Sequence, residues 1–257
     1  MYVANQHRIP EAEALEFARR NGNGELISIY EGKIQSTHVP FIIVKNSDGP
    51  NDIMNDGRNN RTDIAAQTAN NNTAAFHLET HLSQVNPQWR GAGESEALLV
   101  VNIADQHVPG HFLPAEREFD RLPQAPTWNY LTVHIRGSFE AIHDSDWKLA
   151  HLSRFVHHFE PVWRAESHSN YERLNHALPA LVGIRMQIRE IVGKAKLHQQ
   201  LDSPQISDLA EKLTNSDPHN PIPQLMHEIA VPWAKNRESR VAYARTRKTL
   251  PVINPSL

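Results

Sequence analysis

The stretch Pro126-Thr127-Trp128-Asn129-Tyr130 leads directly into the β-forming segment 130–140, and together they decide the fold. Branched and aromatic side chains recur through this segment, which favours a strand. Because successive side chains of a strand alternate, Trp128 and Tyr130 share one face, and Thr127 and Asn129 share the other. The sequence therefore predicts a long strand that begins with one aromatic face and one polar face.

Further strand-forming segments lie on both sides of this stretch. They occur at 26–30, 34–38, 41–45, 75–79, 97–103 and 181–192. Glu31-Gly32 separates the first two as a tight turn. The spacing of apolar residues and the helix-ending signals predict helices at 11–20, 82–89, 147–158 and 203–213. Several short strands with few helices predict a mostly β fold with peripheral helices, of the α+β class, arranged as a small barrel.

The composition divides the chain into a main domain and an appendage. Residues 1–213 contain every predicted strand. Within them, 46–73 shift to Asn, Asp, Gly and Thr without apolar periodicity, which predicts a flexible insertion. A linker at 218–223 and a mixture of helix and coil follow, so 214–257 are predicted to form a C-terminal appendage.

Composition and charge exclude several classes of site. The chain has no cysteine, which excludes disulfides, thiolate nucleophiles and cysteine-bound metals. No signal-like segment or apolar run of about 20 residues is found, so we expect a cytoplasmic protein without a membrane partner. The net charge of -3 gives no general attraction to nucleic acid. The basic residues at 235–248 have two interpretations, a local DNA-binding patch or a solvated helix face.

Five separated segments resemble the PaiB family of FMN-binding negative transcriptional regulators, over about residues 1–213. They are Met1-Tyr2-Val3, Ser36-Thr37-His38-Val39-Pro40-Phe41, His81-Leu82-Ser83-Gln84-Val85-Asn86-Pro87-Gln88-Trp89, the stretch 126–130 with Val133-His134 and Gly137, and Gly193-Lys194-Ala195-Lys196-Leu197. The resemblance implies a split β-barrel related to flavin reductases and pyridoxamine-phosphate oxidases, with FMN as cofactor. It also implies a homodimer that represses transcription through DNA or a transcription partner.

One loop departs from the family. Relatives carry Ile-Ser-Pro-Ser-Trp-Tyr where this chain has His-Phe-Leu-Pro-Ala-Glu-Arg-Glu-Phe at 111–119. Because this loop leads into the shared motif, FMN can have been lost or replaced. The alternative functions are a flavin-dependent oxidoreductase, for which no catalytic residue can be named, and a protein that binds haem or another cofactor. A non-enzymatic role is favoured, although no helix-turn-helix is evident.

Four candidate cofactor-binding residues precede the central stretch. Thr37 and His38 end a predicted strand before Pro40, where they can reach a phosphate or a ring edge, or satisfy local backbone groups. His81 and Asn86 bracket the predicted short helix. They can present donors to an FMN phosphate, or Asn86 can simply end the turn while Trp89 fills the core.

Four more candidates lie in and after the central stretch. Trp128, with Tyr130, can stack near an isoalloxazine or seal a dimer interface, and Asn129 can bind a ring carbonyl; alternatively, the large aromatic side chains belong to the core. Lys194 and Lys196 fall on one face of an extended segment and suit a phosphate, or are ordinary exposed lysines.

Sixteen histidines raise the question of a metal or haem site. His151, His157 and His158 lie on one predicted helix, but no carboxylate completes a recognisable metal-binding pattern. His111 has no feature that favours haem ligation. The sequence therefore predicts no metal site.

Overall fold

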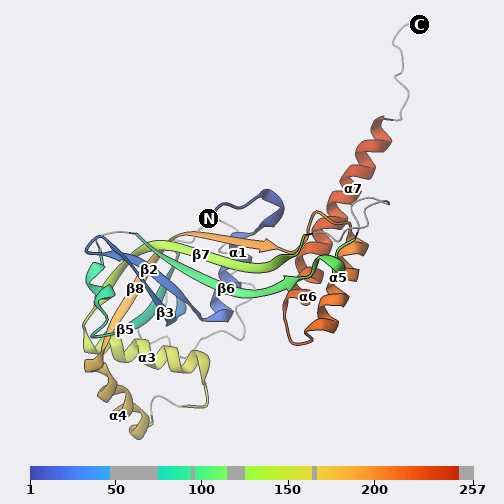
Figure 1. Ribbon diagram of the computed structural model, residues 1–257. Coiled ribbons are helices and arrows are strands. Elements are labelled where there is room, and N and C mark those ends of the chain that lie inside the picture. The colour runs from blue at the N-terminus through green and yellow to red at the C-terminus, as the bar shows by residue number, and fades with distance from the viewer. Residues whose placement is uncertain (47–74, 94–95, 115–124, 164–166, 249–257) are drawn as a thin grey trace. The chain divides into compact units, whose positions relative to one another are not determined.

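The computed structural model describes residues 1–46, 75–93, 96–114, 125–163 and 167–248. Its strands are β1 (Arg8–Ile9), β2 (Asn23–Tyr30), β3 (Lys33–Pro40), β4 (Ile42–Lys45), β5 (Phe76–Ser83), β6 (Glu96–Val108), β7 (Thr127–Ile142) and β8 (Leu181–Lys196). They form one sheet in the order β3-β2-β6-β7-β8-β5-β4, with β1 beside β8 (Figure 1). The pairings β2–β3, β2–β6, β4–β5 and β5–β8 are antiparallel, and no pairing among the described strands joins the two ends of the order.

The described helices flank the strands in the sequence, as predicted. They are α1 (Glu11–Asn21), α3 (Ser145–Phe159), α4 (His168–Ala177), α5 (Ser203–Ser216), α6 (Ile222–Leu225), a π-helical turn η7 (Met226–Ala230), and α7 (Val231–Lys248). Shorter 3-10 turns are η1 (Asn5–His7), η4 (Pro87–Gly91), η5 (Gly110–Phe112) and η6 (Leu178–Ala180). The predicted mostly β fold with peripheral helices is confirmed.

The chain divides into two compact units. The first contains Met1, 9–103 and 132–193, and the second contains 2–8, 104–131 and 194–257. The long strands β6, β7 and β8 therefore contribute residues to both units. The predicted domain boundary after residue 213 falls inside α5 and stays a prediction, whereas most of the predicted insertion at 46–73 lies outside the described residues.

In the first unit, local sequence signals position the elements. Glu31 and Gly32 both have positive φ, at 50° and 70°, as the two-residue turn of the β2–β3 hairpin requires. Asp144 caps α3 by accepting from the backbone N–H of Trp147. Figure 1 shows α3 and α4 on the same side of the strands of this unit. Fully buried side chains form its core, among them Leu26, Leu78, Leu99, Ile135 and Ile184.

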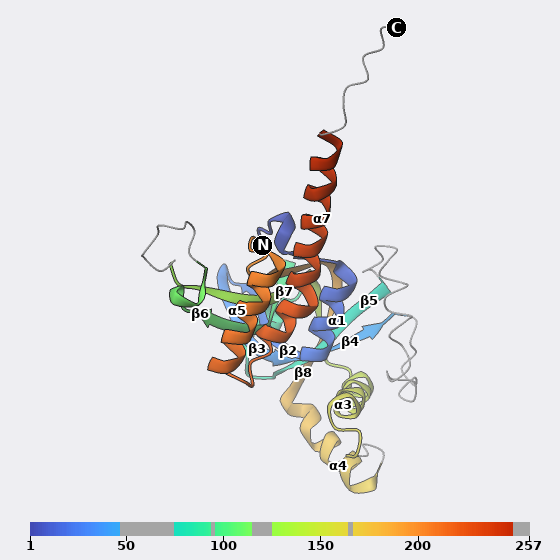
Figure 2. The same ribbon diagram turned by 90° about the vertical axis from the view of Figure 1, so that its right-hand side faces the viewer.

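In the second unit, α5, α6 and α7 pack together (Figure 1). Asp202 and Gln205 form a capping box at the start of α5. The core between the helices consists of fully buried apolar residues, including Ile206, Leu209, Leu213, Ile222 and Met226. The residues of α7 at 241–246 are all exposed, and Figures 1 and 2 show this end of the helix extending past α5 and α6.

Two local predictions were wrong. Leu82 and Ser83 end β5 instead of opening a helix, and only the 3-10 turn η4 follows. β6 continues to Val108, beyond the predicted strand 97–103, and burial alternates along its last residues. In the predicted C-terminal appendage, the described residues include a helix α7 that continues through Lys248, whereas 249–257 lie outside the described residues, so the predicted mixture of helix and coil stays a prediction. No described helix has both the length and the apolar character required to cross a membrane.

Candidate functional site

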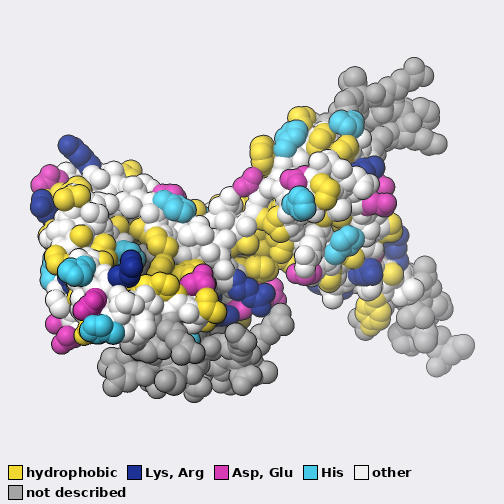
Figure 3. Space-filling model, turned by 90° about the horizontal axis from the view of Figure 1, so that it is seen from below, with side chains coloured by type: hydrophobic (Ala, Val, Ile, Leu, Met, Phe, Trp, Pro, Cys, Tyr) yellow, Lys and Arg dark blue, Asp and Glu magenta, His cyan; other side chains and the backbone are white. Residues whose placement is uncertain are grey.

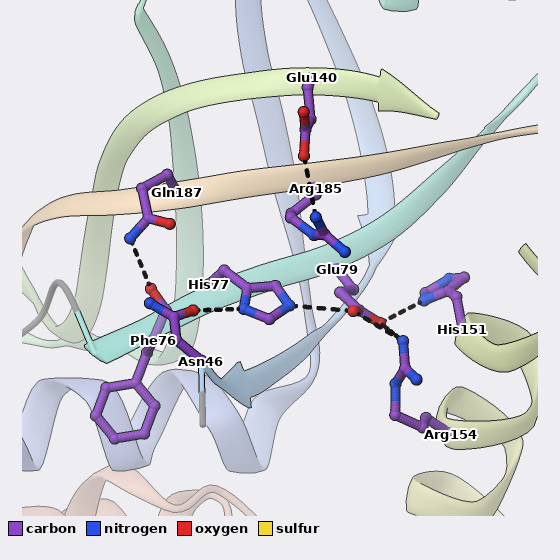
Figure 4. Close-up of polar contacts among 9 residues, drawn as sticks. All are labelled: Asn46, Phe76, His77, Glu79, Glu140, His151, Arg154, Arg185 and Gln187. Atoms are coloured by element: carbon purple, nitrogen blue, oxygen red, sulfur yellow. Dashed lines mark hydrogen bonds and ion pairs between the residues drawn. The ribbon is translucent and has the colours of Figure 1, made fainter. Parts of the chain in front are cut away.

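A buried carboxylate on β5 binds polar side chains of α3 in the first unit (Figure 4). Glu79 accepts from His77 Nε2 at 3.1 Å and from His151 Nδ1 at 3.2 Å. Its two oxygens also accept from Arg154 Nη2 at 2.9 and 2.8 Å. His81 Nδ1 lies 3.1 Å from His151 Nε2. A line of hydrogen bonds therefore runs from Glu79 through His151 to the predicted site residue His81.

The Glu79 carboxylate determines which ring nitrogens of His151 and His81 carry a proton. Burial raises the pKa of Glu79, but hydrogen bonds from His151 and His77 and the charge of Arg154 outweigh burial and hold the pKa well below its ordinary value. An ionised carboxylate only accepts, so His151 donates through Nδ1 and its Nε2 accepts from His81. Burial, reinforced by His151, lowers the pKa of His81 to about 4. Donation from His81 Nε2 to a phosphate would therefore require protonation of this ring.

Thr37 and Asn86, both predicted to bind a cofactor, lie together. Asn86 Nδ2 donates to Thr37 Oγ1 at 2.9 Å, and Thr37 Oγ1 donates to Gln88 Oε1. Gln88 is fully buried and donates to Leu26 O at 2.8 Å and to Ser28 Oγ at 3.1 Å. These bonds join η4 to β2 and β3. A ligand role for Thr37 and Asn86 stays a prediction.

His38 points away from Thr37, because neighbouring side chains of β3 alternate. Its side chain is 63% exposed, and Nδ1 lies 2.8 Å from Oε1 of its cross-strand partner Glu25. Ser36 Oγ donates to the same carboxylate at 3.0 Å. The structure therefore joins Thr37 to Asn86, His38 to Glu25, and His81 to the carboxylate of β5.

In the second unit, the two predicted lysines lie beside one aromatic ring. Lys194 Nζ is 5.4 Å and Lys196 Nζ is 6.0 Å from the centroid of Tyr130. Lys196 Nζ also donates to Thr127 Oγ1 at 2.6 Å and to Trp128 O at 3.0 Å. An ammonium has three donors, so Lys196 retains one. Neither lysine pairs with a carboxylate among the described residues. We call Lys194, Lys196 and Tyr130 the lysine–tyrosine site.

Trp128 and Asn129 lie on opposite faces of β7, as predicted. Trp128 is 52% exposed, and its ring meets His107 edge to face at 5.6 Å. Asn129 is fully buried; its Oδ1 lies 2.6 Å from His198 Nδ1, and its Nδ2 donates to Met226 Sδ at 3.4 Å. Trp128 therefore offers an accessible ring, whereas both ends of the Asn129 amide are engaged. Binding of Asn129 to a flavin carbonyl stays a prediction.

The positive charges of the lysine–tyrosine site lower the pKa values of two nearby histidines. Burial lowers the pKa of His7, and the charges of Lys194 and Lys196 lower it further against a hydrogen bond with Gln199. Burial, with Lys196 and then His7, lowers the pKa of His198 to about 4. Adjacent cations disfavour additional positive charge and favour an anion. The chemistry of this site therefore suits a phosphate.

Comparison with known proteins assigns the chain to a family. Residues 1–190 match the family described as "Putative FMN-binding domain". The chain belongs to this FMN-binding family. It is 24% identical over 236 residues to "Protease synthase and sporulation protein PAI 2" of Bacillus subtilis (strain 168), covering 89% of this chain and 96% of that protein. The predicted PaiB-type membership is confirmed, and it supports FMN as the candidate cofactor.

Two solved structures are similar to the chain. The flavocytochrome Anf3 from Azotobacter vinelandii is 14% identical with a TM-score of 0.48, and the comparison covers 76% of this chain and 72% of that chain. The FAD and heme binding protein from Mycobacterium smegmatis is 16% identical with a TM-score of 0.43, covering 72% and 70%.

The family match contains six of the eight predicted site residues. Lys194 and Lys196 lie beyond its end at residue 190, so the lysine–tyrosine site extends past the matched region. Among the described residues, no group of three or more His, Asp or Glu is arranged to hold a metal ion. His111, considered for haem, is exposed and meets Phe112 edge to face at 4.8 Å. The remainder of the loop that departs from the FMN-binding family, 115–119, lies outside the described residues.

Sequence reasoning missed several residues that this FMN-binding family member uses to organise its sites. His77 and Glu79 alternate along the predicted strand 75–79, and His81 continues the alternation just beyond it, which was a signal for a polar face. Tyr130 was recognised as aromatic but not as a ring that two lysines contact. No sequence signal pairs Gln199 with Arg237, because 38 residues separate them.

Proposed function

We propose that this chain binds FMN, with the phosphate at the lysine–tyrosine site. The observation that carries the proposal is the pair of ammonium groups beside Tyr130, which have unused donors and no described carboxylate partner. A phosphate monoester carries about 1.5 to 2 negative charges at neutral pH. Two lysines can therefore neutralise it while donating charge-assisted hydrogen bonds.

The aromatic surroundings fit the rest of FMN. Lys196 donates to the carbonyl of Trp128, which fixes the ammonium close to the strand position that carries the exposed indole. An exposed aromatic ring stacks favourably on a planar heterocycle. The residues present therefore fit a phosphate joined to a flat ring: Lys194 and Lys196 would hold the phosphate, and Trp128 would contact the ring. When bound, FMN supplies hydride and electron transfer.

We infer further that the protein is a cytoplasmic homodimer that represses transcription. The support is the PaiB-type family membership and the similarity along 96% of the Bacillus subtilis protein. Direct DNA binding would require a local basic surface, because the net charge is -3. Figure 3 shows both signs of charge interspersed on the described part of one face. The exposed Lys235, Arg240 and Arg245 of α7 are the candidate phosphate contacts.

The absorption spectrum of the purified protein tests the cofactor. A flavin spectrum whose chromophore co-elutes with the protein, or appears when FMN is added to it, is expected. A protein that neither carries nor takes up FMN would refute the proposal, and a haem spectrum would favour the alternative cofactor.

Two measurements test the regulatory role. Sedimentation equilibrium should give twice the chain mass of 29.2 kDa. A mobility-shift titration at physiological salt should show specific binding to DNA upstream of the protein's own gene. Replacement of Arg240 by Gln should reduce this binding for all sequences alike, since phosphate contacts carry no sequence information. A monomer would exclude the homodimer, and absence of specific binding would exclude direct repression.

A further inference from the structure

The segment that follows the lysine–tyrosine site is held by a side chain of α7. Arg237 Nη1 donates to the carbonyls of Gln199 at 2.8 Å and Gln200 at 3.0 Å, and its Nη2 donates to Leu201 O at 2.7 Å. The guanidinium lies 5.4 Å from the ring centroid of Trp233, one turn earlier on α7. A guanidinium has a rigid, planar set of donors, which suits three consecutive carbonyls.

The next residue of α7 holds the other end of the same segment. Ser203 donates to Glu238 through its backbone N–H at 2.7 Å and through its hydroxyl at 2.9 Å. Ser203 is the first residue of α5. Arg237 and Glu238 therefore bind both ends of 199–203, and we call this arrangement the α7 clasp.

Gln199 connects the clasp to the lysines. Its backbone carbonyl accepts from Arg237, whereas its buried side chain donates to Ala195 O at 2.6 Å and accepts from Leu197 N–H at 2.9 Å. Ala195 lies between Lys194 and Lys196 in β8. One residue therefore binds α7 with its main chain and the lysine-bearing strand end with its side chain.

The turn between them is conformationally demanding. His198 has φ 61°, in the left-handed region that non-glycine residues seldom occupy. Its ring is buried against Asn129. Such a conformation persists where surrounding contacts fix it. The contacts of Gln199 and Arg237 on the following residues provide that constraint.

We propose that Gln199 and Arg237 are positioning residues of the lysine–tyrosine site, so that phosphate binding there and the α7 clasp stabilise each other. The coupling part of the proposal rests on the proposed FMN function. Neither residue touches the ligand; both act by fixing the strand end that carries the ammonium groups. Both lie beyond residue 190, so the family match assigns them no role. Linkage requires that, if the clasp favours FMN binding by some factor, FMN favours the clasp by the same factor.

Hydrogen exchange of the ligand-free full-length chain tests the positioning. Arg237→Lys keeps the positive charge but removes the planar guanidinium donors that bind the carbonyls of 199–201. Gln199→Met removes the hydrogen bonds of the Gln199 side chain and keeps its backbone carbonyl. Each should accelerate exchange of the Leu197 amide about fivefold or more, while the amide of Leu209 in α5 stays protected. Ser239→Ala, an exposed change on the same helix, is the control and should leave Leu197 exchange unchanged. Wild-type exchange at Leu197 in both test variants would overturn the proposal.

Titration with FMN tests the coupling. Arg237→Lys and Gln199→Met should each weaken FMN binding about fivefold or more, and Ser239→Ala should not. FMN should in turn slow exchange of the Ser203 amide, which donates to Glu238. Unchanged FMN affinity in the two test variants would overturn the coupling. If wild type binds no FMN, the proposed function and the coupling both fail, and exchange at Leu197 still decides the positioning.

Discussion

Replacement of Glu79 by Gln should strongly destabilise the first unit. The carboxylate side chain is 2% exposed, and its described partners His151 and Arg154 are 1% and 15% exposed. Among the described residues, Glu79 is the one carboxylate that these donors contact, so the change removes that negative charge and points an amide N–H₂ at some of the donors. Breaking a buried, hydrogen-bonded ion pair costs about 3 to 5 kcal/mol. We expect a loss of about 3 kcal/mol in the free energy of unfolding, since the amide oxygen still accepts.

Glu140→Gln is the matched control. Glu140 pairs with Arg185 at 3.3 Å in the same unit, but these side chains are 60% and 39% exposed (Figure 4). Exposed pairs contribute at most about 1 kcal/mol. Urea unfolding at pH 7, followed by circular dichroism and tryptophan fluorescence, measures both variants, and coincident transitions justify the two-state treatment. Equal stabilities of the two variants would refute the role assigned to Glu79.

The same carboxylate predicts a pH dependence. Its folded-state pKa lies below the ordinary 4.5, so its stabilisation is complete above pH 4.5 and decreases as the pH falls toward the folded value. The stability difference between wild type and Glu79→Gln should therefore shrink by about 1.4 kcal/mol for each pH unit below 4.5. A difference that is constant between pH 7 and 3.5 would contradict this explanation.

Three further predictions concern single residues. The pKa of His81 is lowered from 6.5 to about 4, so between these pH values the ring is protonated in the unfolded chain but neutral in the folded chain. The free energy of unfolding should therefore fall by up to about 3 kcal/mol between pH 6.5 and 4. Urea unfolding should show a smaller fall in His81→Gln. Gly137→Ala would place its Cβ against the backbone carbonyl of Gln187, so thermal unfolding should reveal severe destabilisation, whereas Ser138→Ala on the same strand should change little. Trp128→Ala should weaken FMN and riboflavin binding equally, about tenfold by fluorescence titration, because it removes only ring stacking; unchanged affinity would exclude a stacking role.

Much of the fold could be predicted from local signals. The strand that follows Pro126, the turn at Glu31-Gly32 and the helix capped by Asp144 each depend on neighbouring residues. The bounds of α7 could not be predicted because its polar sequence gives little periodicity, whereas the helix is held by packing and by Arg237. The end of β5 at Ser83 was misread as a helix because Leu82, Val85 and Trp89 recur at helical spacing, and the sequence does not reveal that Ser83 pairs with Leu181 of β8.

The sequence indicated which residue types form the candidate site, but it did not specify how these residues are arranged. Lys194 and Lys196 were expected to share a face, and the structure shows that this face also includes Tyr130 from β7. Thr37 and His38 were predicted to reach a ligand or to make local contacts, and strand alternation gives them different side-chain partners. Asn129 is buried beside His198, and its binding to a ring carbonyl stays a prediction. These outcomes depend on contacts between distant segments, which spacing along one sequence does not specify.

A calorimetric comparison of FMN with riboflavin tests the central claim most directly. The two ligands share the isoalloxazine ring and differ in the phosphate, so their difference in affinity isolates the phosphate contact. Wild type should bind FMN at least tenfold more tightly than riboflavin, about 1.4 kcal/mol, and the Lys194→Gln, Lys196→Gln double variant should bind both equally. Equal affinities in wild type, or an FMN preference that survives in the double variant, would contradict phosphate binding at the lysine–tyrosine site.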